Sequence, residues 1–108
     1  EVKKADKFGW KGVNGWNVDF GKVASISFIE IETEIPLRKN VKNDRLYFII
    51  DGKADFCVDG KNFKVTDKKV IYVPKNSVYS YKPDGKLKLI EVNVPPFAKS
   101  GEVVINNK

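Results

Sequence analysis

Short apolar runs divided by turn residues recur along the whole chain, and they constrain its fold more than any other feature. Three Asp-Gly pairs, at 51–52, 59–60 and 84–85, suit tight hairpin turns. The second half of Val23–Ile35 alternates isoleucine with acidic residues, as a strand with one wet face does. The 3.6-residue spacing of a helix is hard to find over any ten residues. The pattern predicts an all-β sandwich, jelly roll or small barrel with strands near 23–35, 45–50, 54–58, 62–65, 70–73, 78–81 and 87–94.

The ends of the chain differ in character from this middle part. Residues 1–22 include Phe8–Phe20, where two tryptophans and two phenylalanines lie among three glycines. We interpret this segment as an irregular aromatic ribbon that packs on the barrel, in preference to a platform for ligand stacking. Residues 23–97 are expected to form the barrel, and residues 98–108 an edge strand or tail.

The composition indicates the class of protein and the cellular compartment to which the chain belongs. A chain of 108 residues with 42% hydrophobic residues supports one domain. No apolar stretch approaches the 18 residues of a membrane span, so no membrane partner is expected. The single cysteine, Cys57, cannot form an internal disulfide, which favours a reducing, cytoplasmic location. With no histidine in the chain, Cys57 is interpreted as an inert thiol.

The net charge of +6 comes almost wholly from lysine, since Arg38 and Arg45 are the only arginines. Proteins that bind nucleic acids use the guanidinium group of arginine to contact phosphates and guanine bases. Here the cationic residues are almost all lysines, and they are scattered from Lys3 to Lys108. We interpret them as a solvated surface and expect no nucleic-acid partner.

From about Ser25 to Phe97 the sequence resembles a small single-domain cupin, a family built on a jelly-roll barrel. Three runs carry the resemblance, namely Leu46–Gly52, Val70–Tyr81 and Leu89–Pro96. In the two family motifs the closing glycine is Gly52 and the proline is Pro74, while Asn76 replaces a glycine. Asparagine tolerates the positive φ that such a position requires. The remaining motif positions hold Thr33 for the first glycine, Lys39, Val41, Arg45 and Tyr79 for the metal ligands, and Pro83 for an asparagine.

The departures from the family pattern fall on the metal site. Transition metals need imidazole, thiolate or carboxylate ligands, and the matched positions offer an ammonium, a valine, a guanidinium and a phenol. The resemblance therefore implies a cupin barrel with no metal and no cofactor.

In this register Lys39, Arg45 and Tyr79 project toward the barrel mouth, and strand alternation adds Tyr47 and Tyr81. Such a pocket would suit a small anionic or sugar-like ligand. The alternative is that Arg45 pairs internally with Glu30, Glu32 or Glu91 while tyrosines fill the barrel. We interpret Glu91, which alternates with Ile90 and Val92, as an outward residue on the polar face, in preference to an inward carboxylate that could accept a proton or orient Arg45. Asp44, next to Arg45, is expected to point outward.

Three functions remain open at this point. The first is a ligand-binding module without catalysis. The second is a metal-independent sugar or nucleotide-sugar isomerase or epimerase, which would need a tyrosine or lysine with a lowered pKa. The third is a structural dimerisation module with a filled barrel. A homodimer is expected in each case, from the exposed sheet edges and the apolar residues near Trp10 and Trp16.

Overall fold

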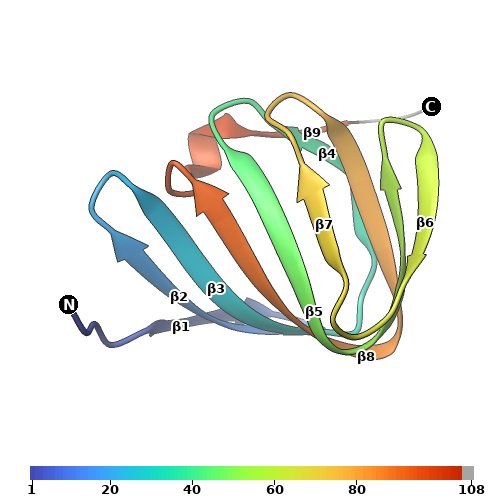
Figure 1. Ribbon diagram of the computed structural model, residues 1–108, viewed down its shortest axis with the longest axis horizontal. Helices are drawn as coiled ribbons and strands as arrows, with labels where there is room; N and C mark the ends of the chain where they lie inside the picture. The colour runs from blue at the N-terminus through green and yellow to red at the C-terminus, as the bar shows by residue number, and fades with distance from the viewer. Residues whose placement is uncertain (106–108) are drawn as a thin grey trace.

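The computed structural model describes residues 1–105, which form one antiparallel sheet of nine strands and a single 3-10 turn, η1, at Lys99–Gly101. Figure 1 shows this sheet curling into an open barrel. The prediction of an all-β fold is confirmed. The strands are β1 Asp6–Trp10, β2 Val13–Phe20, β3 Ala24–Ile31, β4 Ile35–Asn40, β5 Asp44–Val58, β6 Lys61–Val65, β7 Val70–Val73, β8 Val78–Val94 and β9 Glu102–Val104.

Two long strands, β5 and β8, pair with each other along most of their length and hold the barrel together. The first half of β5 and the second half of β8 belong to one wall, with the order β1-β2-β3-β8-β5-β7. Their other halves belong to a second wall, with the order β9-β4-β8-β5-β6. Both strands bend between the walls, at the lower edge of the view in Figure 1.

Only one of the three Asp-Gly pairs forms the hairpin turn predicted for it. Asp59 and Gly60 have φ values of 48° and 81° and connect β5 to β6. Asp51-Gly52 instead lies inside β5, where the register with β8 shifts, and Asp84-Gly85 lies inside β8. The prediction of separate strands at 45–50 and 54–58, and at 78–81 and 87–94, is therefore wrong: in each case one strand bends without turning back.

The bend at Gly52 requires glycine for two reasons. Its φ is +105°, and a Cβ at this position would lie 2.7 Å from the Lys86 carbonyl oxygen of the paired strand. We expect Gly52→Ala to lower the free energy of unfolding by about 3 kcal/mol or more, measured by urea denaturation. Gly60, with φ +81° and open space around it, is the matched control, and Gly60→Ala should cost about 1 kcal/mol. Equal losses at the two sites would contradict this account of the bend.

The ends of the chain are more regular than the sequence indicated. The predicted irregular ribbon is a two-stranded hairpin, because β1 pairs with β2 in continuous register and β2 pairs in turn with β3. The long strand predicted at 23–35 is interrupted after Ile31, and β4 begins at Ile35. At the other end β9 pairs with β4 on the sheet edge, and residues 106–108 of the expected tail lie outside the described residues. Among residues 1–105, no helix is long and apolar enough to cross a lipid bilayer.

The apolar core lies between the two walls and leaves one end of the barrel polar. Inward side chains of β3, β5 and β8 fill the closed end, among them Ile29, Ile49 and Leu89. An aromatic cluster continues this core, with the rings of Phe56 and Tyr81 stacked 4.5 Å apart. The polar inward residues are left at the open end, where a cavity begins.

Candidate functional site

A cavity of about 400 Å³ opens between the two walls. Its walls combine apolar and aromatic side chains with ionisable groups, a composition typical of small-molecule sites. Rings of Trp10 and Phe97 line it from β1 and from the segment after β8. Its other principal lining side chains are Asp6, Phe8, Asn17, Asp19, Ser27, Ile29, Arg38, Arg45, Tyr47, Tyr79, Tyr81, Glu91 and Glu102.

Cross-strand pairing gathers the polar residues of the first wall into two rows on its concave face. One row runs from β3 through β8 to β5 as Ser25, Asn93 and Arg45. The next row begins in β2 and runs as Asn17, Ser27, Glu91 and Tyr47. The row that follows is apolar, with Ile29, Leu89 and Ile49. Because successive inward residues of a strand are two positions apart, the inward face of this wall changes from polar to apolar along its strands, and Ile29 lines the apolar part of the cavity.

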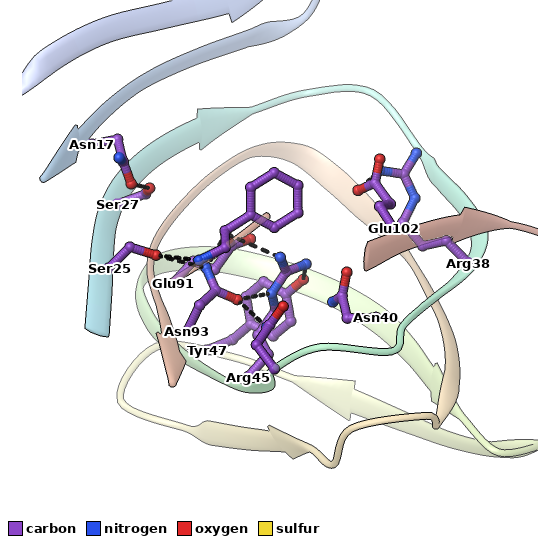
Figure 2. A network of polar contacts seen from close by, with 12 residues as sticks. Asn17, Ser25, Ser27, Arg38, Asn40, Arg45, Tyr47, Glu91, Asn93 and Glu102 are labelled. Atoms are coloured by element: carbon purple, nitrogen blue, oxygen red, sulfur yellow. Dashed lines mark hydrogen bonds and ion pairs between the residues drawn. The ribbon is translucent and has the colours of Figure 1, made fainter. Parts of the chain in front are cut away.

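Arg45 is the centre of the polar network shown in Figure 2. Its side chain is buried, and its Nη2 lies 3.5 Å from Oε2 of Glu91. Its Nε donates a hydrogen bond to Oδ1 of Asn93 at 2.6 Å, and its Nη1 donates to the hydroxyls of Tyr47 and Tyr79. Each of the three guanidinium nitrogens thereby faces at least one protein acceptor.

Asn93 holds the charged pair in place by using all of its hydrogen-bonding capacity. Its Oδ1 accepts from Arg45 and, at 2.8 Å, from Nδ2 of Asn43. Its Nδ2 donates to Oε2 of Glu91 at 3.2 Å and to Oγ of Ser25 at 3.4 Å. Asn93 therefore contacts both members of the Arg45–Glu91 pair, and we assign it a positioning role.

A second ion pair lies on the other side of the opening, as Figure 2 shows. Nη1 of Arg38, in β4, donates to Oε2 of Glu102, in β9, at 3.0 Å. Both side chains are partly exposed. The Nε of Arg38 is buried and has no hydrogen-bond partner in the described part of the chain.

The surroundings set the protonation states of these groups. Burial alone would lower the pKa of the Arg45 guanidinium, but Glu91 and the nearby tyrosines raise it overall, so Arg45 stays charged. Burial raises the pKa of Tyr47, Tyr79 and Tyr81, and the charge of Arg45 offsets this only in part. The three phenols are neutral hydrogen-bonding groups at neutral pH.

The charges of the cavity do not sum to a positive value. Lys7 contributes to the rim, but its ammonium lies on the outer face, 4.6 Å from the centre of the Trp16 ring. The guanidiniums of Arg38 and Arg45 are each paired with a carboxylate, and Asp6 and Asp19 add two further acidic groups. The strongly cationic pocket expected from the sequence is therefore not present.

No family model and no curated protein matches the sequence. Solved structures do match the fold. Pac13 of Streptomyces, described as a nucleoside dehydratase, superposes with a TM-score of 0.84 at 17% identity, covering 98% of this chain and 92% of Pac13. KdgF of Halomonas gives a TM-score of 0.75 at 11% identity over 88% of this chain and 89% of KdgF. The cupin domain of Cnp3 from Schizosaccharomyces pombe gives 0.74 at 18% identity over 83% of this chain and 68% of that one. The chain has the cupin fold.

The cupin register drawn from Gly52 brings together four of the five residues expected at the barrel mouth. Arg45, Tyr47, Tyr79 and Tyr81 all line the cavity, although each is at most 4% exposed. They form its floor, and more exposed side chains form its entrance. As expected, Asn76 adopts a positive φ, of 73°.

Lys39 is the predicted residue that does not line the cavity. The register between β4 and β8 shifts between Ile35 and Arg38, which is the mark of a β-bulge. Since one extra residue reverses the faces of the strand beyond it, Arg38 takes the inward position that simple alternation from Ile35 gives to Lys39. Arg38 and Glu102 are therefore site residues that the sequence reasoning missed.

Glu91 also lies on the face opposite to the one predicted. It lines the cavity and pairs with Arg45, whereas its neighbours Ile90 and Val92 are on the convex face. The internal pairing considered for Arg45 is thus present, yet the barrel is not filled. Asp44 does point away from the cavity and accepts a hydrogen bond from the backbone N–H of Lys75.

Among residues 1–105, no three His, Cys, Asp or Glu side chains come together in a way that could hold a metal ion. Of the positions that the cupin motif assigns to metal ligands, Arg45 and Tyr79 are hydrogen-bonded to each other. Val41 uses its backbone N–H to bind the Gly101 carbonyl and does not line the cavity. That the purified protein carries no transition metal stays a prediction.

Proposed function

We propose that this cupin domain binds a small, uncharged, sugar-like molecule in the mouth of its barrel. The observation that carries the proposal is the ion-paired Arg45–Glu91 unit in the wall of a cavity of about 400 Å³. A paired guanidinium and carboxylate offer both donors and acceptors to hydroxyl groups without presenting net charge. Of the two ligand classes expected from the sequence, this arrangement favours the sugar-like one over the anionic one.

The aromatic rim supports a ligand that also contains a flat ring. Trp10 is 58% exposed at the cavity edge, and Phe97 lies over the Arg45 guanidinium at 5.5 Å. Exposed rings of this kind stack on sugar faces and on bases. Solved structures of the similar protein Pac13 contain uridine, a neutral molecule that joins a sugar to a flat ring. Uridine is therefore the first probe we would use.

We expect uridine to raise the melting temperature and to bind measurably in calorimetry, and uridine 5′-monophosphate to bind no more tightly. Trp10→Ala should weaken uridine binding about tenfold, because stacking on one base contributes about 1–3 kcal/mol. Phe63→Ala is the matched control, because Phe63 is similarly exposed but lies outside the cavity. Tighter binding of the phosphate would contradict the proposal, as would the absence of binding by both uridine and glucose at millimolar concentration.

A second candidate is a metal-independent enzyme acting on the same class of ligand. It is favoured by one observation, namely that the Glu91 carboxylate and the tyrosine hydroxyls line one cavity. The tyrosines do not have the lowered pKa that the sequence-based hypothesis required, so Glu91 would be the proton acceptor. Proton NMR of uridine after incubation with the protein distinguishes the two candidates, since a binding module returns the ligand unchanged, whereas NMR detects an isomer of the same mass as well as a product of different mass.

A further inference from the structure

The convex face of the first wall carries two complete rows of apolar side chains, on the side opposite to the ligand cavity. The rows cross five neighbouring strands, β7, β5, β8, β3 and β2, and follow the register of the strand pairs. Neither row contains a charged or amide side chain. One row is Tyr72, Leu46, Val92, Ile26 and Val18, and the other is Val70, Phe48, Ile90, Phe28 and Trp16.

Five of these ten side chains are exposed to solvent, and the other five are half-buried. Val70 is 59% exposed, Tyr72 55% and Phe48 42%, and Ile50 and Val94 extend the exposed area at the ends of the rows. With about 200 Å² for a large side chain, the face presents on the order of 700 Å² of apolar surface. The largest apolar patch on a typical monomer is about 300–600 Å², and a standard interface buries about 800 Å² per partner. The face is large enough to form most of a stable interface.

The charge distribution indicates what kind of partner fits. The chain carries +6 overall, but the two rows are uncharged; at their margins Lys88 pairs with Glu30, and the Lys7 ammonium lies 4.6 Å from the centre of the Trp16 ring. A nucleic acid or an acidic protein would need cations on the contact face. An uncharged apolar face with β8 at its centre can pack against the same face of a second copy across a twofold axis.

We propose that a second copy of this chain covers the convex face, so that two barrels pack back to back with their cavities pointing away from each other. The sheet edges, which the sequence suggested as the contact, offer less, because the edge strands β1 and β6 have five residues each, β7 four and β9 three. Trp16 takes part in this interface, whereas Trp10 is at the cavity rim on the other side of the sheet. The interface is independent of the ligand proposed above.

Sedimentation velocity at tens of micromolar tests the proposal, and the wild-type chain should sediment at twice its mass of 12.2 kDa. Phe48→Glu, between Val70 and Ile90 in one row, should weaken the dimer at least a hundredfold, because it places two carboxylates in an apolar interface. Phe63→Glu is the matched control: Phe63 is 46% exposed on β6, away from the two rows, and its substitution should leave the dimer intact. Circular dichroism verifies that each variant is folded.

If Phe48→Glu does not fold, Tyr72→Glu on the edge strand β7 replaces it, since this side chain is more exposed and contributes less to packing within the chain. A wild-type chain that sediments as a monomer would overturn the proposal. A dimer that persists in folded Phe48→Glu and Tyr72→Glu would also overturn it, as would equal loss of the dimer in Phe63→Glu.

Discussion

Replacing Arg45 by alanine is expected to lower the free energy of unfolding by about 3–5 kcal/mol, measured by urea denaturation. The substitution leaves Glu91 without its counterion on a largely buried wall. It also removes one of the two donors to Oδ1 of Asn93 and a donor to each of the hydroxyls of Tyr47 and Tyr79. Losing one member of a buried, hydrogen-bonded ion pair costs more than the pair itself contributes, since the remaining charge stays desolvated.

Arg38 provides the control for this experiment, because it too is a cavity arginine paired with a carboxylate. Its side chain is more exposed than that of Arg45, so water can solvate Glu102 after the change. We expect Arg38→Ala to cost about 1–2 kcal/mol. The double substitution Arg45→Met with Glu91→Leu should recover part of the loss, because it removes both charges. A loss below about 1 kcal/mol for Arg45→Ala would contradict the buried network.

Residues that lie on regular strands were placed correctly from the sequence. Arg45 and Tyr47 on β5, and Tyr79 and Tyr81 on β8, are pairs two positions apart, and each pair shares a face as the period of a strand requires. Between Gly52 and Arg45 the chain has no turn, so counting back over seven residues kept the correct phase. The error at Lys39 arises because counting back from Gly52 to this residue crosses the β-bulge in β4, which changes the residues of that strand that point inward.

The error at Glu91 has a different origin. Assigning a face from polarity assumes that one face of the strand is apolar and the other is wet. Around Glu91 the reverse holds, because the concave face is polar at the cavity and the convex face carries Ile90 and Val92. The same apolar convex face that suggests an interface between two copies is what made the inward Glu91 resemble a surface residue.

The three Asp-Gly pairs did not identify hairpin turns reliably, because this dipeptide indicates a residue with positive φ and not necessarily a reversal of the chain. Gly52, Gly60 and Gly85 all have positive φ, but a hairpin follows only at Gly60. The difference depends on what pairs across the position: at Gly52 the strand β8 continues alongside, with the Lys86 carbonyl close to the glycine. Such tertiary pairing is not encoded in the dipeptide.

The second large effect is expected at high pH, where the buried tyrosines should make the free energy of unfolding fall steeply. The folded-state pKa values of Tyr47, Tyr79 and Tyr81 lie above the value of about 10 that a phenol has in the unfolded chain. Below pH 10 both states hold these protons, so the full stability is present. Above pH 10 the unfolded chain releases the protons and the folded chain keeps them, so stability falls as the pH rises.

Each of the three phenols contributes a slope of about 1.4 kcal/mol per pH unit, so together they lower the stability by about 4 kcal/mol per unit above pH 10. Phenolate absorbance at 295 nm and circular dichroism, followed together, should show the three buried phenols ionising in the same transition in which the sheet unfolds. Tyr81→Phe leaves two such phenols and should reduce the slope by one third. A gradual ionisation of all three phenols with the fold intact would mean that water reaches the floor of the cavity, and that the Arg45 network is held in a solvated wall.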